Sequence, residues 1–284
     1  MKNDCCKICG NPSLIVFAHT ARCDRCNTLL YFPYPNEDEL IEVSEGERKS
    51  LSREFSLEWY TESAFNNHIN FTNMIRFAMD ESFKGKKLDI LDYGGGAGQF
   101  SLVLKSHFPE CTTYITDICD AYLLEEFGAL NRQIRFSEFD RDETKFDFIF
   151  LNDVFEHLVD PLAVLKQLEG KLKIHGKIFI DTPRQFWIYP ILRQFSTSLY
   201  KKVLRGTVST AHLQIWSKQS FEFVVKKCGL KIVKYKELCE FTMPANFYMN
   251  NMGITNPITR FAGNILYRCA RWLVTNKIQS VITK

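Results

Sequence analysis

The feature that most constrains the fold is a glycine-rich turn between an apolar run and a predicted helix. The apolar run is Leu88–Leu91, glycines occupy positions 94, 95, 96 and 98, and a helix is expected to begin at Gln99. A strand that ends in glycines and continues into a helix brings its backbone close to a ligand. The turn therefore predicts an α/β fold with a ligand at the end of this strand.

The spacing of the glycines separates two cofactor classes. The nicotinamide fingerprint G-x-G-x-x-G would need its third glycine where the chain has Gln99. The pattern that fits is D-x-G-x-G-x-G, formed by Asp92, Gly94, Gly96 and Gly98. Asp117 lies 19 residues after Gly98, at the end of a second strand-like run. A carboxylate there can accept hydrogen bonds from both hydroxyls of a ribose, which indicates a nucleoside cofactor.

Together with Asp117, this pattern resembles motif I of the class I S-adenosylmethionine-dependent methyltransferases. The resemblance implies that the loop passes under the methionine and ribose portions of S-adenosylmethionine. It also implies a Rossmann-like, doubly wound, mostly parallel sheet of seven strands. The residues of these two segments that are then expected to bind the cofactor are Asp92, Gly94, Gly96, Gly98 and Asp117.

The pattern of apolar residues downstream agrees with such a sheet. A helix is expected over 58–83, followed by strands over 88–93, 113–117, 133–136, 146–151, 176–181 and 230–235 and a final strand near 240–243. The continuous apolar run Phe148–Leu151 suits a strand that helices bury on both faces. Alternating strands and helices predict a parallel sheet, with ligands at the carboxyl ends of the first and fourth strands.

Chain length and net charge limit the domain organisation and the classes of binding partner. The 284 residues suit one α/β domain with additions. With the resemblance above, this implies an amino-terminal unit over 1–45, a methyltransferase domain over 46–245 with a cap insertion at 184–209, and an amphipathic helical tail over 246–284. The net charge of +3 argues against a general electrostatic grip on nucleic acid. No signal segment is recognised, and no apolar run approaches the ~20 residues of a membrane span. The 10 cysteines suit intracellular thiols, so a cytoplasmic protein is expected.

Two C-x-x-C pairs near the start predict a metal site. Two such pairs can direct four thiolates to one point and complete a tetrahedral S4 site that suits Zn²⁺; here they are Cys6 with Cys9 and Cys23 with Cys26. Because four protein ligands leave no open position, the zinc is expected to be structural. Gly10 and Asn27, which tolerate positive φ, follow the pairs, and Cys5 and His19 are spare candidates as ligands. The segment 22–40 resembles the zinc ribbon that precedes many bacterial methyltransferases.

The segment Asn152–Pro161 closely resembles the D-V-(L/F)-E-H-(L/I)-x-D-P element of a subgroup that includes ubiquinone-pathway and sugar methyltransferases. The resemblance implies that Asn152 and Asp153 line the cofactor, and that Glu156 and His157 begin the next helix and face the acceptor. A histidine that a carboxylate orients can remove a proton from a hydroxyl nucleophile. Helix capping by Glu156 and structural packing of His157 are the alternative. Some relatives use the equivalent pair with a divalent ion, which leaves a Mg²⁺ site open.

Two further segments contribute candidates. Thr210–Ser217 matches the family element H-L-x-x-(F/W)-(S/T) before a helix over 218–228, so His212 is an alternative base or substrate ligand, or a structural residue. Ser217 is expected to cap that helix. The region 138–140 is expected near the adenine, where Asp140 could accept from the exocyclic amine; a solvated loop is the alternative.

The cap insertion and the tail are both rich in aromatic and basic residues. Basic, aromatic segments of this kind commonly form a lid and a tail packed on the core, and they can also lie on an anionic membrane surface or cover an apolar substrate. The expected reaction is methyl transfer to a hydroxyl of a small-molecule, sugar or lipid-linked glycan acceptor, with positioning of nucleophile and methyl group as the main catalytic effect. The zinc-ribbon sugar C-methyltransferases are a related subtype with a further carboxy-terminal domain, which is not expected here, so O-methylation is the first expectation.

Two other function classes remain as alternatives. Enzymes that methylate base amines typically have (N/D)-P-P-(Y/F) after the fourth strand, where this chain has Asn152–Phe155 without prolines. Cytosine C5 methylation needs a nucleophilic cysteine in a Pro-Cys or similar setting, and the chain has no Pro-Cys pair. A nucleic-acid or protein methyltransferase and a non-catalytic zinc-ribbon adaptor are therefore secondary to the small-molecule enzyme.

Overall fold

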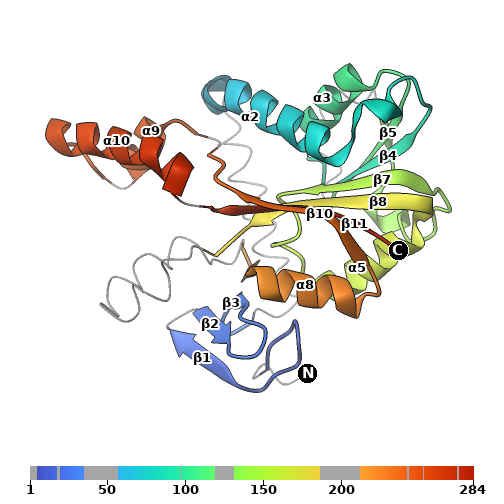
Figure 1. Ribbon diagram of the computed structural model, residues 1–284, viewed down its shortest axis with the longest axis horizontal. Helices are drawn as coiled ribbons and strands as arrows, with labels where there is room; N and C mark the ends of the chain where they lie inside the picture. The colour runs from blue at the N-terminus through green and yellow to red at the C-terminus, as the bar shows by residue number, and fades with distance from the viewer. Residues whose placement is uncertain are drawn as a thin grey trace.

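The computed structural model describes residues 5–17, 20–34, 57–96, 98–118, 131–185, 212–241, 243–251, 253–273 and 275–284. These ranges form a seven-stranded sheet with helices on both faces and a smaller four-stranded sheet below it (Figure 1). His19, the whole of the segment 37–56 and positions 186–209 of the predicted cap lie outside the described residues. Among the described residues, no helix combines the length and apolar composition that a membrane span requires.

The large sheet has the doubly wound topology that the sequence predicts. Its order is β10 (Lys231–Leu238), β11 (Lys277–Thr283), β8 (Leu172–Pro183), β7 (Phe146–Asn152), β4 (Asp89–Tyr93), β5 (Thr112–Thr116) and β6 (Arg132–Gln133). Strands β4 to β8 pair in parallel, whereas β11 is antiparallel to both of its neighbours. The predicted mostly parallel, seven-stranded α/β sheet is confirmed.

Helices bury both faces of this sheet. Helices α2 (Leu57–Ala78) and α3 (Gln99–His107) cover one face, and α5 (Pro161–Gly170) and α8 (Lys218–Lys227) cover the other (Figure 1). Successive residues of β7 point to opposite faces, so Phe148 and Phe150 join the core under α2 and α3 while Ile149 and Leu151 join the core under α5 and α8. This two-sided burial explains the unbroken apolar run in the sequence.

The start of α5 corrects one prediction. Glu156 and His157 were expected to begin this helix, but they lie in a turn, and α5 begins at Pro161. Asp160 is the N-cap, because its side chain accepts a hydrogen bond from the Ala163 amide and proline suits the first helical position. The predicted cap of α8 is confirmed: Ser217 accepts from the Ser220 amide in a capping box.

The position of the last strand corrects a second prediction. A final strand was expected near 240–243, with a helical tail beyond 245. Instead the strand at the end of the chain, β11, inserts between β8 and β10. Val281 enters the core of one face, and Ile278 and Ile282 enter that of the other, so burial on both sides holds this strand. In the described part of the tail, the helices are therefore α9 (Ala245–Asn251) and α10 (Pro257–Leu273), which extend from the sheet as an arm (Figure 1).

The amino-terminal unit shares its sheet with the main domain. Its strands β1 (Leu14–Phe17), β2 (Thr20–Cys23) and β3 (Leu29–Tyr31) form an antiparallel sheet, and β3 continues it by pairing with β9 (Gln214–Ile215). Strand β9 comes almost directly after His212 in the chain. The amino-terminal unit is thus bonded to a segment that carries a candidate site residue.

Candidate active site

The glycine-rich loop after β4 has the backbone that its sequence pattern requires. The three glycines of the D-x-G-x-G-x-G pattern all have positive φ, +74° at Gly94, +50° at Gly96 and +84° at Gly98. Residues other than glycine are strained at positive φ. The Gly94 amide donates to the Thr116 carbonyl (2.7 Å), and Gly98 is the N-cap of α3. The loop is thus fixed between the ends of β4 and β5.

Asp117 lies beside this loop. It follows β5 directly, and its Oδ2 accepts a hydrogen bond from the Gly96 amide at 3.0 Å. The side chain is half-buried. The structure therefore brings the carboxylate and the glycine loop to the same edge of the sheet, as the ribose-binding hypothesis requires, while the role of Asp117 stays a prediction.

Asp92 lies beneath the loop and is buried. Its Oδ2 accepts a hydrogen bond from Ser101 Oγ at 2.8 Å. Burial raises the pKa of Asp92 to about 7, although the Ser101 hydrogen bond opposes this shift. Gly95, which lies outside the predicted pattern, packs on this carboxyl: a Cβ at Gly95 would lie 2.8 Å from Asp92 Cγ. The loop therefore rests on the Asp92 carboxyl at Gly95.

The end of β7 presents two polar residues at the same edge. Asn152 Oδ1 is buried and has no hydrogen-bond partner among the described residues. Buried acceptors are usually paired, so this oxygen is available to a ligand donor. Asp153 has a φ of +52°, unusual for a residue other than glycine, and its amide donates to the Asp181 carbonyl at 3.1 Å.

A lysine that the sequence analysis missed holds Asp153 in place. Lys277 Nζ, from the start of β11, bonds Asp153 Oδ1 and also Asp181 Oδ2 (2.7 Å). Burial alone would lower the pKa of Lys277, but the carboxylates of Asp153 and Asp181 raise it well above its usual value. Lys277 is therefore a buried cation at the carboxyl edge. Its only sequence signal is a charge at the start of an apolar segment.

Glu156, His157 and His212 converge. Their potential ligand atoms all lie within 4.8 Å of one another. Glu156 is fully buried, its Oε2 accepts from Thr182 Oγ1 at 2.9 Å, and its Oε1 lies 3.7 Å from His157 Nε2. The two imidazole rings have centroids 5.0 Å apart. Burial, with Asp153 adding to it, raises the pKa of Glu156 well above its usual value.

Gln214 ties the two histidine segments together, and the sequence analysis did not identify it. Its side-chain amide donates to the carbonyls of Phe155 (3.0 Å) and Leu158 (2.8 Å) on either side of the Glu156–His157 turn. The backbone amide of Gln214 donates to the Glu156 carbonyl at 3.3 Å. A glutamine shortly before a predicted helix carries no functional signal in the sequence, because its role depends on a turn 56 residues away.

Asp140 lies at the far edge, after β6 and the short 3₁₀ turn Phe136–Glu138. It is exposed and accepts a hydrogen bond from Gln167 of α5. Burial, with the charges of Asp140 and Asp117 adding to it, raises the pKa of Tyr93 to about 12. The ring centroid of Phe136, a residue that is 41% exposed, lies 6.3 Å from that of Tyr93. The sequence analysis did not identify this aromatic residue, and the adenine role of Asp140 stays a prediction.

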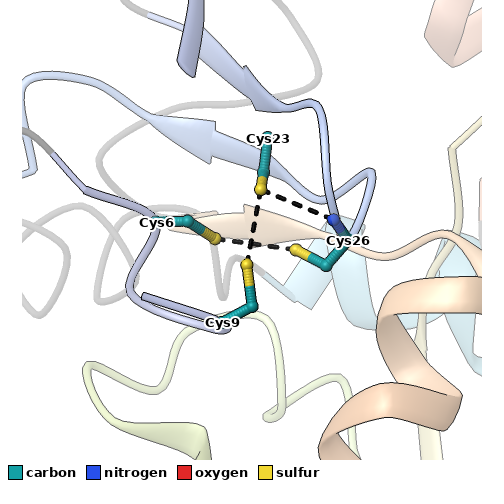
Figure 2. A group of neighbouring side chains, drawn as sticks. All are labelled: Cys6, Cys9, Cys23 and Cys26. Atoms are coloured by element: carbon teal, nitrogen blue, oxygen red, sulfur yellow. Dashed lines mark hydrogen bonds between the residues drawn. The ribbon is translucent and has the colours of Figure 1, made fainter. Parts of the chain in front are cut away.

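The four predicted cysteine ligands form one cluster. Figure 2 shows the thiols of Cys6, Cys9, Cys23 and Cys26 directed toward a common point. The sulfur separations are 3.6 Å for Cys6–Cys26 and 3.5 Å for Cys9–Cys23. A tetrahedral site with Zn–S bonds of about 2.3 Å has sulfurs roughly 3.8 Å apart, so the cluster could hold Zn²⁺. The turns after the pairs have positive φ, +72° at Gly10 and +59° at Asn27, as predicted.

Comparison with known proteins gives a family match. The family model described as a methyltransferase domain matches residues 65–235. No curated protein matches the chain in sequence.

Several solved structures share the fold. A chain of the Haloferax volcanii complex between the Trm112 methyltransferase activator and a methyltransferase is 13% identical, with a TM-score of 0.54 over 88% of this chain and 98% of that chain. The mitomycin 7-O-methyltransferase MmcR is 12% identical, with a TM-score of 0.52 over 86% and 60%. The [4+2]-cyclase SpnF is 10% identical, with a TM-score of 0.51 over 76% and 81%. At these identities the likeness concerns the fold alone.

Proposed function

Because the chain belongs to the methyltransferase domain family and is an S-adenosylmethionine-dependent methyltransferase, we propose that it methylates a hydroxyl of a small-molecule, sugar or lipid-linked glycan acceptor. The observation that supports this proposal is the convergence of Glu156, His157 and His212 beside the end of β7. Two imidazoles at that edge can serve as the base that accepts the proton of a hydroxyl nucleophile.

The cofactor would be held by the loop after β4 and by the ends of β5 and β7. The loop glycines allow close approach of the backbone, and Asp117 is placed to accept from ribose hydroxyls. Asn152 Oδ1 supplies a buried acceptor that has no partner among the described residues. S-adenosylmethionine supplies, when bound, an electrophilic methyl carbon on a sulfonium.

The residues around the acceptor would act on its proton. One imidazole accepts the hydroxyl proton. A hydrogen bond at its other nitrogen, or contact with the neighbouring imidazole, keeps that ring oriented. Thr182 fixes the Glu156 side chain, and Gln214 fixes the turn that carries His157. The imidazole rings of His157 and His212 therefore keep their relative positions. Near-attack geometry of this kind is the main source of rate in a displacement reaction.

A second way of activating the hydroxyl is a divalent cation held by the same three residues. The observation that favours it is Glu156 Oε1, which is buried and has no hydrogen-bond partner in the described part of the chain. Imidazole with carboxylate suits Zn²⁺, Mn²⁺ or Fe²⁺ better than Mg²⁺. If turnover is lost on chelation and one added metal restores it while S-adenosylhomocysteine binding is unaffected throughout, the cation is the activator.

The proposal is tested by the pH dependence of turnover. Methyl transfer from labelled S-adenosylmethionine to soluble and lipid extracts identifies an acceptor fraction, on which His157→Ala and His212→Ala are compared. Removal of a general base should lower kcat about 100-fold or more and abolish the acidic limb of the profile. His68→Ala, an exposed histidine of α2, is the matched control. If both site variants keep the wild-type kcat and profile, base catalysis by these histidines is refuted.

A further inference from the structure

The arm formed by α9 and α10 has an inner face that is packed and an outer face that is not. On the inner face, Tyr267 Oη donates to the Met243 carbonyl (2.7 Å), and its ring stacks on Phe241 with centroids 4.7 Å apart. A Cβ at Gly263 would lie 2.6 Å from Met249 Sδ, so the two helices approach closely there. The arm is thus fixed by its own contacts.

The outer face of α10 is apolar and exposed. Four large apolar side chains of this helix are accessible to solvent: Ile258 (81%), Phe261 (69%), Ile265 (48%) and Leu266 (68%). Ile258, Phe261 and Ile265 recur at intervals of three and four residues, which places them along one side of the helix. Packing on the core is the common explanation for a tail of this composition, and these four exposed residues do not follow it.

The charge of the arm has one sign. Residues 241–276 contain no aspartate or glutamate, whereas arginines stand at positions 260, 268 and 271. Arg268 is exposed and lies on α10 next to the apolar side, because it is seven residues after Phe261. Arg260 is hydrogen-bonded within the arm, where its guanidinium donates to Asn250 Oδ1 (2.7 Å) and to the Ile254 carbonyl (2.9 Å).

We propose that α10 binds the surface of an anionic lipid bilayer, with Phe261 and Ile265 entering the headgroup region and Arg268 facing acidic lipid headgroups. An amphipathic helix with aromatic and aliphatic residues on one side and arginine beside them is the form that lies in the plane of such an interface. A second copy of the chain would fit worse, because a self-complementary contact between two acid-free arms would bring their arginines together.

The place of the arm in the fold adds support. The arm leaves the sheet after Leu238 and returns at Lys277, which pair with each other at the carboxyl edge. Lys277 also contacts Asp153 of the candidate active site. A bilayer bound by α10 would therefore face the edge at which the acceptor is proposed to bind. The inference does not depend on the methylated atom, since it concerns α10 alone.

Co-sedimentation of the full-length protein with vesicles tests the proposal. The wild type should bind vesicles of phosphatidylcholine and phosphatidylglycerol in equal amounts, bind phosphatidylcholine alone more weakly, and lose affinity as salt rises. Phe261→Asp combined with Ile265→Asp should weaken binding roughly tenfold or more. The matched control is Ile174→Asp combined with Val233→Asp, which changes two exposed apolar residues outside the arm and should leave binding unchanged.

Binding of S-adenosylhomocysteine, measured on each variant, shows that the fold and the cofactor site are intact. Failure of the wild type to bind anionic vesicles would overturn the proposal, and so would equal binding by the arm variant and its control. A wild-type dimer that the arm variant dissolves, with no vesicle binding, would assign the face to a second copy. None of these results touches the proposed methyl transfer, which is read from the labelled-methyl assay.

Discussion

At the scale of single residues, the glycine loop and the buried carboxyl beneath it form one unit. Gly95 leaves no room for a side chain above Asp92. A Cβ at this position would also lie 3.0 Å from Ile115 Cγ2. Replacing it with alanine must therefore displace either the carboxyl, the strand or the loop. Because the loop lies at the edge where the cofactor is proposed to bind, its displacement should be visible as lost affinity.

Gly95→Ala is expected to weaken S-adenosylhomocysteine binding by at least about tenfold, which corresponds to roughly 1.4 kcal/mol, because the displaced loop would lose contacts with the cofactor. Isothermal titration calorimetry gives the constant. Gly170→Ala is the control, because a Cβ there would meet nothing within 4 Å. Unchanged affinity in both variants would mean that this loop does not contact the cofactor.

Asp92 should make stability depend on pH. Its pKa of about 7 in the folded protein, raised by burial, exceeds the ordinary value of 3.8. Between these two values the folded chain keeps a proton that the unfolded chain has lost, so the free energy of unfolding falls as pH rises from about 4 to about 7, by up to about 4 kcal/mol. Urea denaturation of Asp92→Asn should show a flatter profile over this interval. The same slope in both proteins would contradict the assignment.

At the scale of elements, β11 supplies the cation that neutralises the carboxylates near the end of β7. Asp153 and Asp181 would be two carboxylates close together at one edge, and Lys277 neutralises them from the neighbouring strand. The positive φ of Asp153 is maintained in this arrangement. The carboxyl edge of the sheet thus depends on a strand that the chain contributes only after the helical arm.

Lys277→Met should destabilise the fold by about 3–5 kcal/mol, because it leaves the fully buried Asp181 without its cation. Lys173→Met is the comparison, since Lys173 pairs with Asp89 and Asp147 where its side chain is 36% exposed, and it should cost about 1 kcal/mol or less. Chemical denaturation measures both. Equal losses would indicate that the Lys277 pairs contribute no more than surface pairs.

The same elements show what sequence could and could not predict. The loop after β4 and the cap of α8 depend on neighbouring residues, such as Gly94 and Ser217, and both were predicted correctly. β11 was missed because its pairing partners lie far away in sequence and its seven residues resemble many short apolar segments. The turn at Glu156 was read as helix because Asp160 and Pro161, which set the true start, come four and five residues later. Contacts made by Lys277 and Gln214 exist only once the strands are assembled.

At the scale of the whole molecule, the amino-terminal unit supports the acceptor side of the site. Its strand β3 pairs with β9, and the Tyr31 amide donates to the Leu213 carbonyl next to His212 at 2.9 Å. Further bonds join the two parts, among them Gln185 Nε2 to the Asn27 carbonyl at 2.6 Å. The loop after β4, in contrast, is held by β5, because the Gly94 amide donates to the Thr116 carbonyl.

Cys23→Ser is therefore expected to remove bound zinc, lower the melting temperature by roughly 10 °C and reduce turnover, while the affinity for S-adenosylhomocysteine changes little. Metal analysis should find one zinc in the wild-type chain and none in the variant. Cys269→Ser, an exposed thiol of α10, should leave all four quantities unchanged. Wild-type protein free of zinc would refute the metal assignment. Full turnover in a zinc-free variant would refute the coupling to His212.

The account rests most directly on Asp117 and the loop that it holds, which calorimetry with S-adenosylhomocysteine can test. Asp117→Asn keeps an oxygen for the Gly96 amide but removes the charge proposed to accept both ribose hydroxyls. We expect one binding site per wild-type chain and an affinity at least about tenfold lower in the variant, because hydrogen bonds to charged groups contribute about 1.5–3 kcal/mol. Equal affinity in the two proteins, or no binding by the wild type, would contradict the account.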